Sequence, residues 1–153
     1  MSQIEVVTYH SKYGPAFVEL NEEWIRSYFE VESTDRFQLN NPEDVILKQG
    51  GEIFFVLENE EPVGTCAMVP HGDTFELAKM AVSPKCKGKG YGDLLMSAAI
   101  EWSRNKGLKQ INLLSNTVLG PAINLYKKHG FEVVHLGAHP DYKRCNIEMV
   151  LKL

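Results

Sequence analysis

Residues 85–92 read KCKGKGYG, and this stretch decides how the whole chain is interpreted. Gly88, Gly90 and Gly92 alternate with other residues between a strand-like segment and an amphipathic segment. Glycine has no Cβ, so the backbone of such a loop can turn sharply, approach a ligand closely and aim several N–H groups outward. Because these N–H groups are hydrogen-bond donors, the loop favours an anionic ligand such as a phosphate group.

The segment after the loop has the apolar spacing of one helical face. Apolar residues recur at three- and four-residue intervals, at Tyr91, Leu94, Leu95, Ala98 and Trp102. A helix that begins near Tyr91 directs the positive end of its dipole at the same anion. An isolated glycine motif also fits a simple turn with solvated lysines, so the remaining sequence has to distinguish the two.

Length and composition predict one soluble globular domain over residues 1–153. The chain is 44% hydrophobic and 24% charged, without internal repeats or low-complexity tracts. A chain of this size buries roughly 70% of its unfolded surface, so it needs no metal or disulfide to fold. No charged start leads into an apolar stretch, and no apolar run approaches the ~18 residues of a membrane span. We therefore expect a cytoplasmic protein that does not engage a membrane.

The cysteines and histidines indicate neither a disulfide framework nor a metal site. Cys66, Cys86 and Cys145 are widely separated and odd in number, which suits reduced thiols. The five histidines form no metal-binding pattern, so no metal is implied. Cys86 lies between Lys85 and Lys87 near the expected helix start. We hypothesise that these positive charges lower its pKa and make it reactive toward alkylation or disulfide exchange.

Charge is unevenly distributed along the chain. The net charge is −4, but residues 1–76 carry 15 acidic and 4 basic residues, whereas residues 77–153 carry 5 acidic and 12 basic residues. This asymmetry suggests an anionic ligand on the later half and a cationic or uncharged polar ligand on the earlier half. Two merely solvated faces are the alternative. Nucleic acid is disfavoured, because the overall balance is acidic and no basic stripe is interleaved with aromatic residues.

The apolar patterns predict seven strands and four helices in a mixed α+β arrangement. The expected strands are Ile4–Thr8, Glu52–Leu57, Val63–Val69, Phe75–Val82, Gln110–Leu114, Phe131–Leu136 and Ile147–Leu151. The expected helices are Pro15–Glu30, a short helix between Pro42 and Gly50, a helix from Tyr91 to Gly107, and Pro121–His129. The chain lacks the GxGxxG loop of dinucleotide-binding folds and the GxxxxGK loop of nucleotide triphosphatases.

Several linked motifs resemble the GNAT superfamily of acyl-CoA-dependent N-acetyltransferases over nearly the whole chain. The family's loop reads Gln or Arg, two residues, Gly, one residue, then Gly or Ala. The matching positions here are Lys87, Gly88, Lys89, Gly90, Tyr91 and Gly92. The resemblance implies that backbone N–H groups of this loop hold the CoA pyrophosphate. Lys87 departs from the family's first residue; it retains a donor and a charge but loses planar, multidentate geometry.

The resemblance also implies the fold. It is a single-domain α+β fold with a mixed, mostly antiparallel sheet of about seven strands, flanked by about four helices, in which a splayed central strand pair holds CoA. ELAKMAV, which precedes the loop, is similar to one of these central strands. Backbone groups of Met80, Ala81 and Val82 are then expected to pair with the pantetheine arm of the cofactor.

Glu76 lies eleven positions before Lys87, where several family members that acetylate amines place a catalytic carboxylate. A base is useful there because an alkylammonium with a pKa near ~10.4 cannot attack a thioester until it loses a proton. The proton could pass to the base directly or through water. The alternative for Glu76 is a strand-edge carboxylate paired with a neighbouring lysine.

Residues 113–131, LLSNTVLGPAINLYKKHGF, are similar to the second half of the family's site. The resemblance implies that Asn116 hydrogen-bonds the pantetheine or the acetyl end of the cofactor. It also makes Tyr126 the candidate general acid, because a hydroxyl near the sulfur can protonate the departing thiolate. The alternative for Tyr126 is a core tyrosine whose ring fills space beside Phe131.

The implied function is transfer of an acetyl group from acetyl-CoA directly to a primary amine of a small molecule or peptide. We expect Trp24, Tyr28 and Phe29, with residues 72–75 nearby, to form the acceptor site, where acidic walls would attract amines. A non-catalytic acyl-CoA-binding sensor or interaction module on the same fold is the alternative. A succinyl or longer acyl donor also remains open, and the sequence is compatible with a homodimer.

Overall fold

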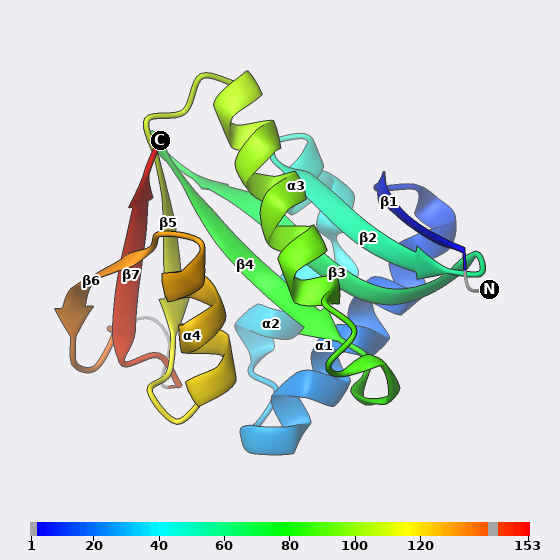
Figure 1. The fold of residues 1–153 in the computed structure, drawn as a ribbon, viewed down its shortest axis with the longest axis horizontal. Helices are drawn as coiled ribbons and strands as arrows, with labels where there is room; N and C mark the ends of the chain where they lie inside the picture. Colours follow the sequence, from blue (N-terminus) through cyan, green and yellow to red (C-terminus); the bar gives the residue numbers. More distant parts are fainter. Residues whose placement is uncertain (1–2, 141–143) are drawn as a thin grey trace.

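The computed structural model describes residues 3–140 and 144–153 and is built on a seven-stranded sheet (Figure 1). Its strands are β1 (Ile4–Thr8), β2 (Glu52–Glu58), β3 (Glu61–His71), β4 (Thr74–Val82), β5 (Gln110–Ser115), β6 (Glu132–Leu136) and β7 (Ile147–Lys152). They lie in the order β1-β2-β3-β4-β5-β7-β6. All neighbours are antiparallel except β4 and β5, which are parallel. The predicted mixed, mostly antiparallel sheet is confirmed.

Helices cover both faces of this sheet (Figure 1). The helices are α1 (Gly14–Tyr28), α2 (Ser33–Asn40), α3 (Tyr91–Asn105) and α4 (Gly120–Lys128), with shorter helical turns η1 (Ser11–Tyr13), η2 (Glu43–Leu47) and η3 (Pro84–Cys86). One core cluster joins α1, α2 and η2 to β2 and β3, and the other joins α3 and α4 to the opposite face. Within the described ranges, none of these helices is long and apolar enough to cross a membrane.

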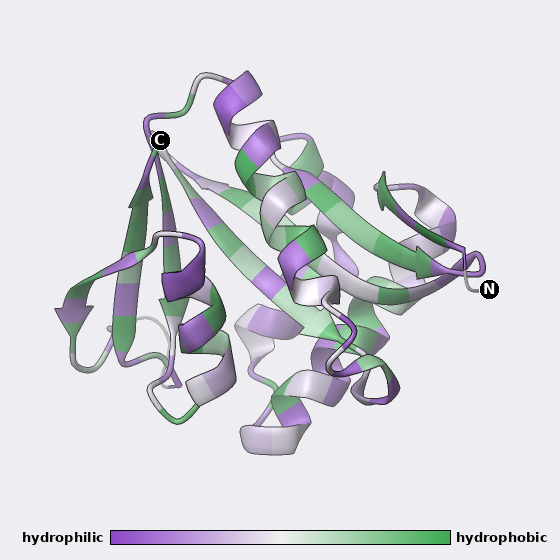
Figure 2. Cartoon of the chain, in the orientation of Figure 1, coloured by the Kyte–Doolittle hydropathy of each residue, from purple (hydrophilic) through white to green (hydrophobic). Residues whose placement is uncertain are grey.

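Strand β2 shows how the sequence produces two cores. Successive side chains of a strand point to opposite faces. Phe55 therefore joins the cluster under α1, whereas Phe54 and Val56 join the cluster under α3. Both faces are covered, so β2 is a continuous apolar run (Figure 2).

Helix α1 largely follows its predicted pattern. The helical spacing of Phe17, Leu20, Trp24 and Tyr28 predicts one apolar face. Of these residues, Phe17 and Leu20 are buried, together with Asn21 and Ile25. Tyr28 lies at the end of α1 and is 55% exposed, so it leaves the buried face that the spacing predicted.

The segment between α1 and β2 was predicted only in part. The short helix expected between Pro42 and Gly50 is present as the five-residue η2, but the helix α2 before it was not predicted. A capping box starts α2: the backbone N–H of Glu32 donates to Asp35 Oδ2 at 2.9 Å, and the Glu32 side chain accepts from the first turn. The usual Ser or Thr of a capping box is replaced by Glu32, so the start signal was not recognised.

Strands β4 and β5 are the point where the sheet opens. Glu76 and Asn112 are in register where these parallel strands meet, and beyond them the two strands separate toward η3 and α4 (Figure 1). Strand β4 also contains a β-bulge, because Lys79 and Met80 together oppose the single residue Cys66 of β3. Lys79 has a φ of 58°, a left-handed conformation that is uncommon for a residue with a side chain.

Candidate active site

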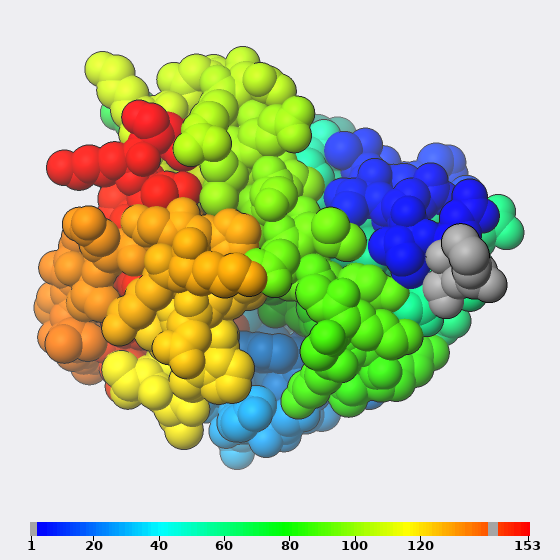
Figure 3. Space-filling view, viewed as in Figure 1, coloured from blue at the N-terminus to red at the C-terminus, as the bar shows by residue number. Residues whose placement is uncertain are grey.

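A pocket of about 830 Å³, including its part open to solvent, lies where β4 and β5 separate. The surface is hollowed between α4 and the segment that leads into α3 (Figure 3). The pocket is lined by Asn21, Trp24, Ile25 and Phe29 at the end of α1, Gln38 of α2, Val69 and His71 of β3, residues 76–80 of β4, residues 114–116 at the end of β5, Leu119 and Tyr126 at α4, and Arg144 and Cys145 before β7.

The glycine loop has the geometry of an anion-binding turn. Gly88 and Gly90 have φ values of 81° and 82°, the left-handed conformation that favours glycine. Their backbone N–H groups have no acceptor among the described residues. The first hydrogen bond of α3 runs from the Leu94 N–H to the Gly90 carbonyl, so the N–H groups of the first turn are free as well. These donors lie at the positive end of the α3 dipole, which suits an anionic ligand.

The three loop lysines are not equivalent. Lys89 Nζ lies 2.9 Å from Glu58 Oε2, and Lys85 Nζ lies 3.3 Å from Glu61 Oε1. Lys87 has no side-chain partner in the described part of the chain. Of the three, Lys87 is therefore the lysine whose ammonium remains available to an anion at the loop.

Packing explains the residue type at each of the two positions that begin α3, Tyr91 and Gly92. The Tyr91 side chain is buried and its hydroxyl donates to Glu58, which leaves its backbone to approach a ligand. A Cβ at Gly92 would lie 3.0 Å from Leu125 Cδ2, so glycine here lets α3 approach α4 closely.

The proposed reactivity of Cys86 is not supported. The residue is 1% exposed and belongs to the core cluster beneath α3. A reactive thiol has to be reached by its partner, and the neighbouring lysines point outward while the thiol points inward.

Glu76 lines the pocket and is paired with His71. Glu76 Oε1 lies 2.7 Å from His71 Nε2, and the Glu76 side chain is 15% exposed. The hydrogen bond to Glu76 raises the pKa of His71 above its usual value. The partner of Glu76 is thus a histidine of the adjacent strand rather than the lysine of the alternative interpretation.

Tyr126 packs in the core and also lines the pocket. Its ring packs edge-on against Phe131 with centroids 6.2 Å apart, and the residue also lines the pocket. Burial raises the pKa of Tyr126 to about 12. The hydroxyl has no hydrogen-bond partner within residues 3–140 and 144–153, so it is free to act on a ligand.

Asn116 also lines the pocket, but its amide is largely engaged within the protein. Nδ2 donates to the Arg144 carbonyl at 2.6 Å, and Oδ1 accepts from the Val118 N–H at 2.9 Å. The second N–H of the Asn116 Nδ2 has no partner among the described residues. The expected contact of Asn116 with the cofactor stays a prediction. Of the expected pantetheine-pairing residues, Met80 lines the pocket, whereas Ala81 and Val82 do not.

The structure divides the expected acceptor residues. Trp24 and Phe29 line the pocket, with ring centroids 6.2 Å apart. Tyr28 is outside the pocket lining. Phe75 is outside it too, because its ring packs against Trp102 at 5.8 Å.

A buried ion-pair cluster forms one wall of the pocket, and the sequence analysis did not predict it. Arg144 donates to both carboxylate oxygens of Asp35, at 2.6 and 2.5 Å, and to Glu32 at 3.0 Å. Asp35 is fully buried, and Lys79 Nζ lies 3.7 Å from its Oδ1. Burial alone would raise the pKa of Asp35, but the hydrogen bonds from Arg144 and the backbone of Glu32 outweigh it and lower the pKa.

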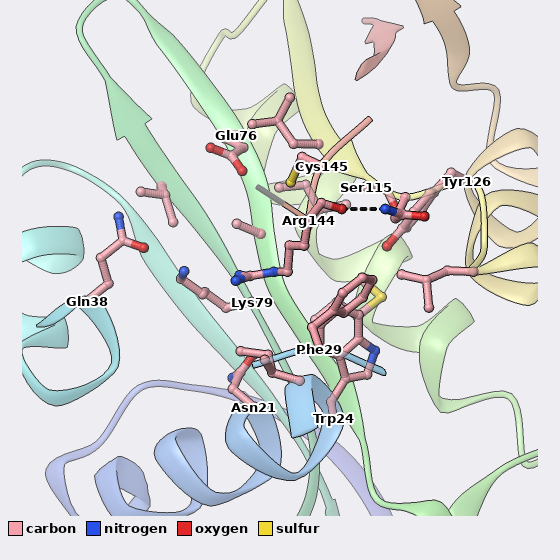
Figure 4. Close-up of a pocket in the computed structure, with 18 of the residues that line it drawn as sticks. Asn21, Trp24, Phe29, Gln38, Glu76, Lys79, Ser115, Tyr126, Arg144 and Cys145 are labelled. Atoms are coloured by element: carbon pink, nitrogen blue, oxygen red, sulfur yellow. Dashed lines mark hydrogen bonds between the residues drawn. The ribbon is translucent and has the colours of Figure 1, made fainter. Parts of the chain in front are cut away.

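The expectation of acidic walls is therefore wrong for this pocket. Its charged lining consists of Glu76, Lys79 and Arg144, which Figure 4 shows, and of His71. The carboxylates of Glu32 and Asp35 lie behind the cations and are outside the lining. Within the described residues, no three His, Cys, Asp or Glu side chains are placed to hold a metal ion.

Residues 17–131 match the acetyltransferase (GNAT) family. The chain belongs to the GNAT family of acetyltransferases. It is 34% identical over 117 residues to the uncharacterized N-acetyltransferase YjgM of Escherichia coli (strain K12), covering 71% of this chain and 68% of that relative. The family makes the chain an acyltransferase.

Solved structures confirm the GNAT fold. A GNAT-family acetyltransferase from Staphylococcus aureus Mu50 has a TM-score of 0.88 at 20% identity, with 99% of both chains covered. The yncA protein of Salmonella typhimurium, solved with its cofactor acetyl-CoA, has a TM-score of 0.79 at 18% identity, with 98% of this chain and 94% of that chain covered.

Two pocket cations of this acetyltransferase left no clear signal in the sequence. In a regular strand, Lys79 and Glu76 would point to opposite faces of the sheet, because they are three residues apart. The β-bulge in β4 breaks this alternation, and both residues line one pocket. Arg144 lies outside any periodic segment, and its partners are more than a hundred residues away along the chain. The pair of His71 and Glu76 could have been predicted from strand register. The two residues lie five positions apart, on either side of the turn that joins β3 and β4.

Proposed function

We propose that this acetyltransferase moves an acetyl group from acetyl-CoA directly to a primary amine of a small molecule or peptide. The observation that carries the proposal is that Glu76 and Tyr126, which come from β4 and α4, line one pocket at the opening between β4 and β5. A candidate base and a candidate acid therefore face the same space.

The chain's residues fit the donor. Acetyl-CoA brings a thioester that activates the acetyl group, and a pyrophosphate that needs hydrogen-bond donors. Free N–H groups at Gly88, Gly90 and the first turn of α3 supply such donors, and Lys87 supplies a charge. Met80 lines the pocket where we propose that the pantetheine arm ends.

Glu76 and Tyr126 have complementary proton roles in this proposal. Glu76 accepts the proton that an acceptor ammonium must lose, directly or through water, and His71 holds the carboxylate in place at 2.7 Å. Because burial raises the pKa of Tyr126 to about 12, its hydroxyl keeps its proton at neutral pH. Tyr126 can then donate this proton to the leaving sulfur.

Ligand binding and turnover test the proposal in sequence. Thermal unfolding is followed with acetyl-CoA, longer acyl-CoAs, NAD and ATP in parallel, and thiol release is then measured against a panel of amines. A ligand at 100 times its Kd stabilises the folded state by roughly 2.7 kcal/mol, which gives a clear rise in Tm. We expect stabilisation by acetyl-CoA, and thiol release only when an amine is present.

Replacing the candidate acid sharpens the test. Tyr126→Phe should lower kcat by about 10²-fold, because acid catalysis of this kind contributes on the order of 10²–10⁴. The Kd for acetyl-CoA should be unchanged. The control is Tyr28→Phe, which removes a hydroxyl from a tyrosine outside the pocket and should have wild-type rates.

Three results would redirect the proposal. Equal rates in the Tyr126→Phe variant and the wild type would end its role as the acid. Binding of acetyl-CoA without turnover on any amine would favour a sensor or interaction module. A larger shift in Tm with succinyl-CoA than with acetyl-CoA would indicate that succinyl-CoA is the acyl donor.

A further inference from the structure

Four charged side chains line the pocket, and three of them have close partners. Glu76 pairs with His71 at 2.7 Å, and Arg144 makes two hydrogen bonds to Asp35. Lys79 is the exception. Its one ion-pair partner among the described residues is Asp35, at 3.7 Å, which is too long for a hydrogen bond.

Lys79 is therefore a buried cation with unused donors. Its side chain is 8% exposed and belongs to the pocket lining. A lysine ammonium has three N–H donors, and burying it without acceptors is costly. Burial accordingly lowers the pKa of Lys79. An anion in the pocket would supply acceptors within hydrogen-bond distance, which Asp35 at 3.7 Å does not.

The backbone is arranged to place this ammonium in the pocket. The bulge at Lys79 and Met80 breaks the alternation of β4, and Lys79 takes a left-handed φ of 58°. Such a conformation costs free energy for a residue with a side chain, and bulges near active sites commonly redirect a side chain. The result is that Lys79 and Glu76, three residues apart, face the same pocket (Figure 4).

A second polar group in the pocket also has no partner. Gln38 Oε1 is buried and accepts no hydrogen bond from any described residue. Gln38 projects from α2 into the pocket that Glu76 and Lys79 enter from β4 (Figure 4). A buried carbonyl without a donor is destabilising, and an amine N–H is a suitable donor for it.

We propose that Lys79 is the anion-binding part of the acceptor site, and that the acceptor is an amine that also carries a carboxylate, such as an amino acid. This inference rests on the proposed acetyl transfer to an amine. The unused N–H donors of the Lys79 ammonium match the acceptor oxygens of a carboxylate. The carboxylate accepts hydrogen bonds from Lys79, while the amine end faces Gln38 Oε1 and the base Glu76.

Matched acceptor pairs test this inference. Thiol release from acetyl-CoA is measured with α-amino acids, with the corresponding α-amino amides, and with simple alkylamines. Each amide keeps the amine and the side chain but has no carboxylate charge. The wild type should have a kcat/KM at least ten-fold higher for the best amino acid than for its amide, because a charge-assisted hydrogen bond is worth about 10- to 100-fold.

Lys79→Met removes the ammonium and keeps the length of the side chain. We expect its preference for acid over amide to fall at least ten-fold, through an increase in KM for the acid. Lys79→Arg should retain part of the preference. The control is Lys127→Met, an exposed lysine of α4, which should behave as wild type.

The outcomes separate this inference from the proposed function. Turnover on amides or alkylamines that equals turnover on amino acids in the wild type would overturn the inference and leave the acetyltransfer proposal standing. Equal losses on acids and amides in Lys79→Met would also overturn it, because they would make Lys79 a general catalytic or structural residue. The comparison within the wild type holds even if Lys79→Met does not fold.

If no amine is acetylated, the proposed function fails and binding decides the inference. Calorimetry then measures the same amino acids and amides against the wild-type protein saturated with CoA. Binding of acids in preference to amides would support the carboxylate site. Equal binding of acids and amides, or binding of neither, would overturn it.

Discussion

Glu76 and His71 form a hydrogen-bonded pair in the lining of the pocket. The carboxylate raises the pKa of His71 through a 2.7 Å hydrogen bond. A folded-state pKa above the unfolded value of about 6.5 means that the pair stabilises the folded state fully below that pH. This stabilisation is lost as the pH rises through the folded pKa of His71.

Glu76→Gln should therefore have two separate effects. The pKa of His71 should fall toward its ordinary value, because the amide carries no charge to hold the imidazolium; NMR titration of the ring protons measures it. The kcat/KM for amines should fall by about 10²-fold, because Gln cannot accept a proton. The matched control is Glu132→Gln on the exposed strand β6.

The pH–rate profile decides between a base and a structural carboxylate. If Glu76→Gln lowers the pKa of His71 but leaves the profile unchanged, Glu76 only pairs with His71. If neither quantity changes, the pair itself does not exist in solution.

At the scale of elements, the glycine loop owes its shape to backbone conformation. A Cβ on Gly90 would meet no atom within 4 Å, so space does not require glycine there; its φ of 82° does. Gly92 is different, since there the neighbouring helix α4 is the constraint. Similar glycines in one motif thus have different physical reasons.

Gly90→Ala should destabilise the protein by about 1 kcal/mol, because a residue with a Cβ pays that much in the left-handed region. For a chain of this size the expected fall in Tm is roughly 2–4 °C. Affinity for acetyl-CoA should fall as well, because the unpaired N–H of Gly90 is one of the donors that we propose for the pyrophosphate. Differential scanning fluorimetry with and without acetyl-CoA measures both quantities.

The control for this loop substitution is Gly120→Ala. Gly120 starts α4, has open space at its Cβ and lacks a positive φ, so alanine should leave Tm unchanged or raise it. Wild-type Tm and acetyl-CoA affinity in Gly90→Ala would contradict the role of backbone conformation in the loop.

At the scale of the whole molecule, the charge asymmetry of the sequence is partly explained by ion pairs within the protein. Ion pairs join the acidic first half to the basic second half at Asp35 with Lys79 and Arg144, and at Glu58 with Lys89. Glu61 and Glu32 add two more such pairs. The asymmetry therefore reports contacts between the halves, besides whatever ligands the two halves bind.

Asp35→Asn should destabilise the fold by about 3 kcal/mol, because it leaves Arg144 buried with an incomplete counter-charge. That corresponds to a fall in Tm of roughly 10 °C. The folded pKa of Asp35 is lowered, so this contribution is present above the unfolded value near 3.9 and is lost as pH falls through the folded pKa. Thermal unfolding of both proteins between pH 3 and 7 measures the difference.

The pairing can be separated from packing by a second variant. The double substitution Asp35→Leu with Arg144→Met replaces the pair by apolar side chains and should recover most of the lost stability. Asp44→Asn breaks the exposed pair between Asp44 of η2 and Lys48, and should have little effect. A stability difference between wild type and Asp35→Asn that stays constant down to pH 3 would contradict the ionised pair.

Local patterns in the sequence determined the strands, most helices and the glycine loop, because apolar periodicity and left-handed glycines act over a few residues. The spacing of the family motifs likewise indicated Glu76 and Tyr126 as the candidate base and acid. Only the tertiary structure decided which side chains share the pocket. The β4 bulge brings Lys79 into the pocket that Glu76 lines, and long-range folding brings Arg144 to Asp35. Burial of Cys86 against α3 was decided in the same way, because it depends on neighbours that are distant in the chain.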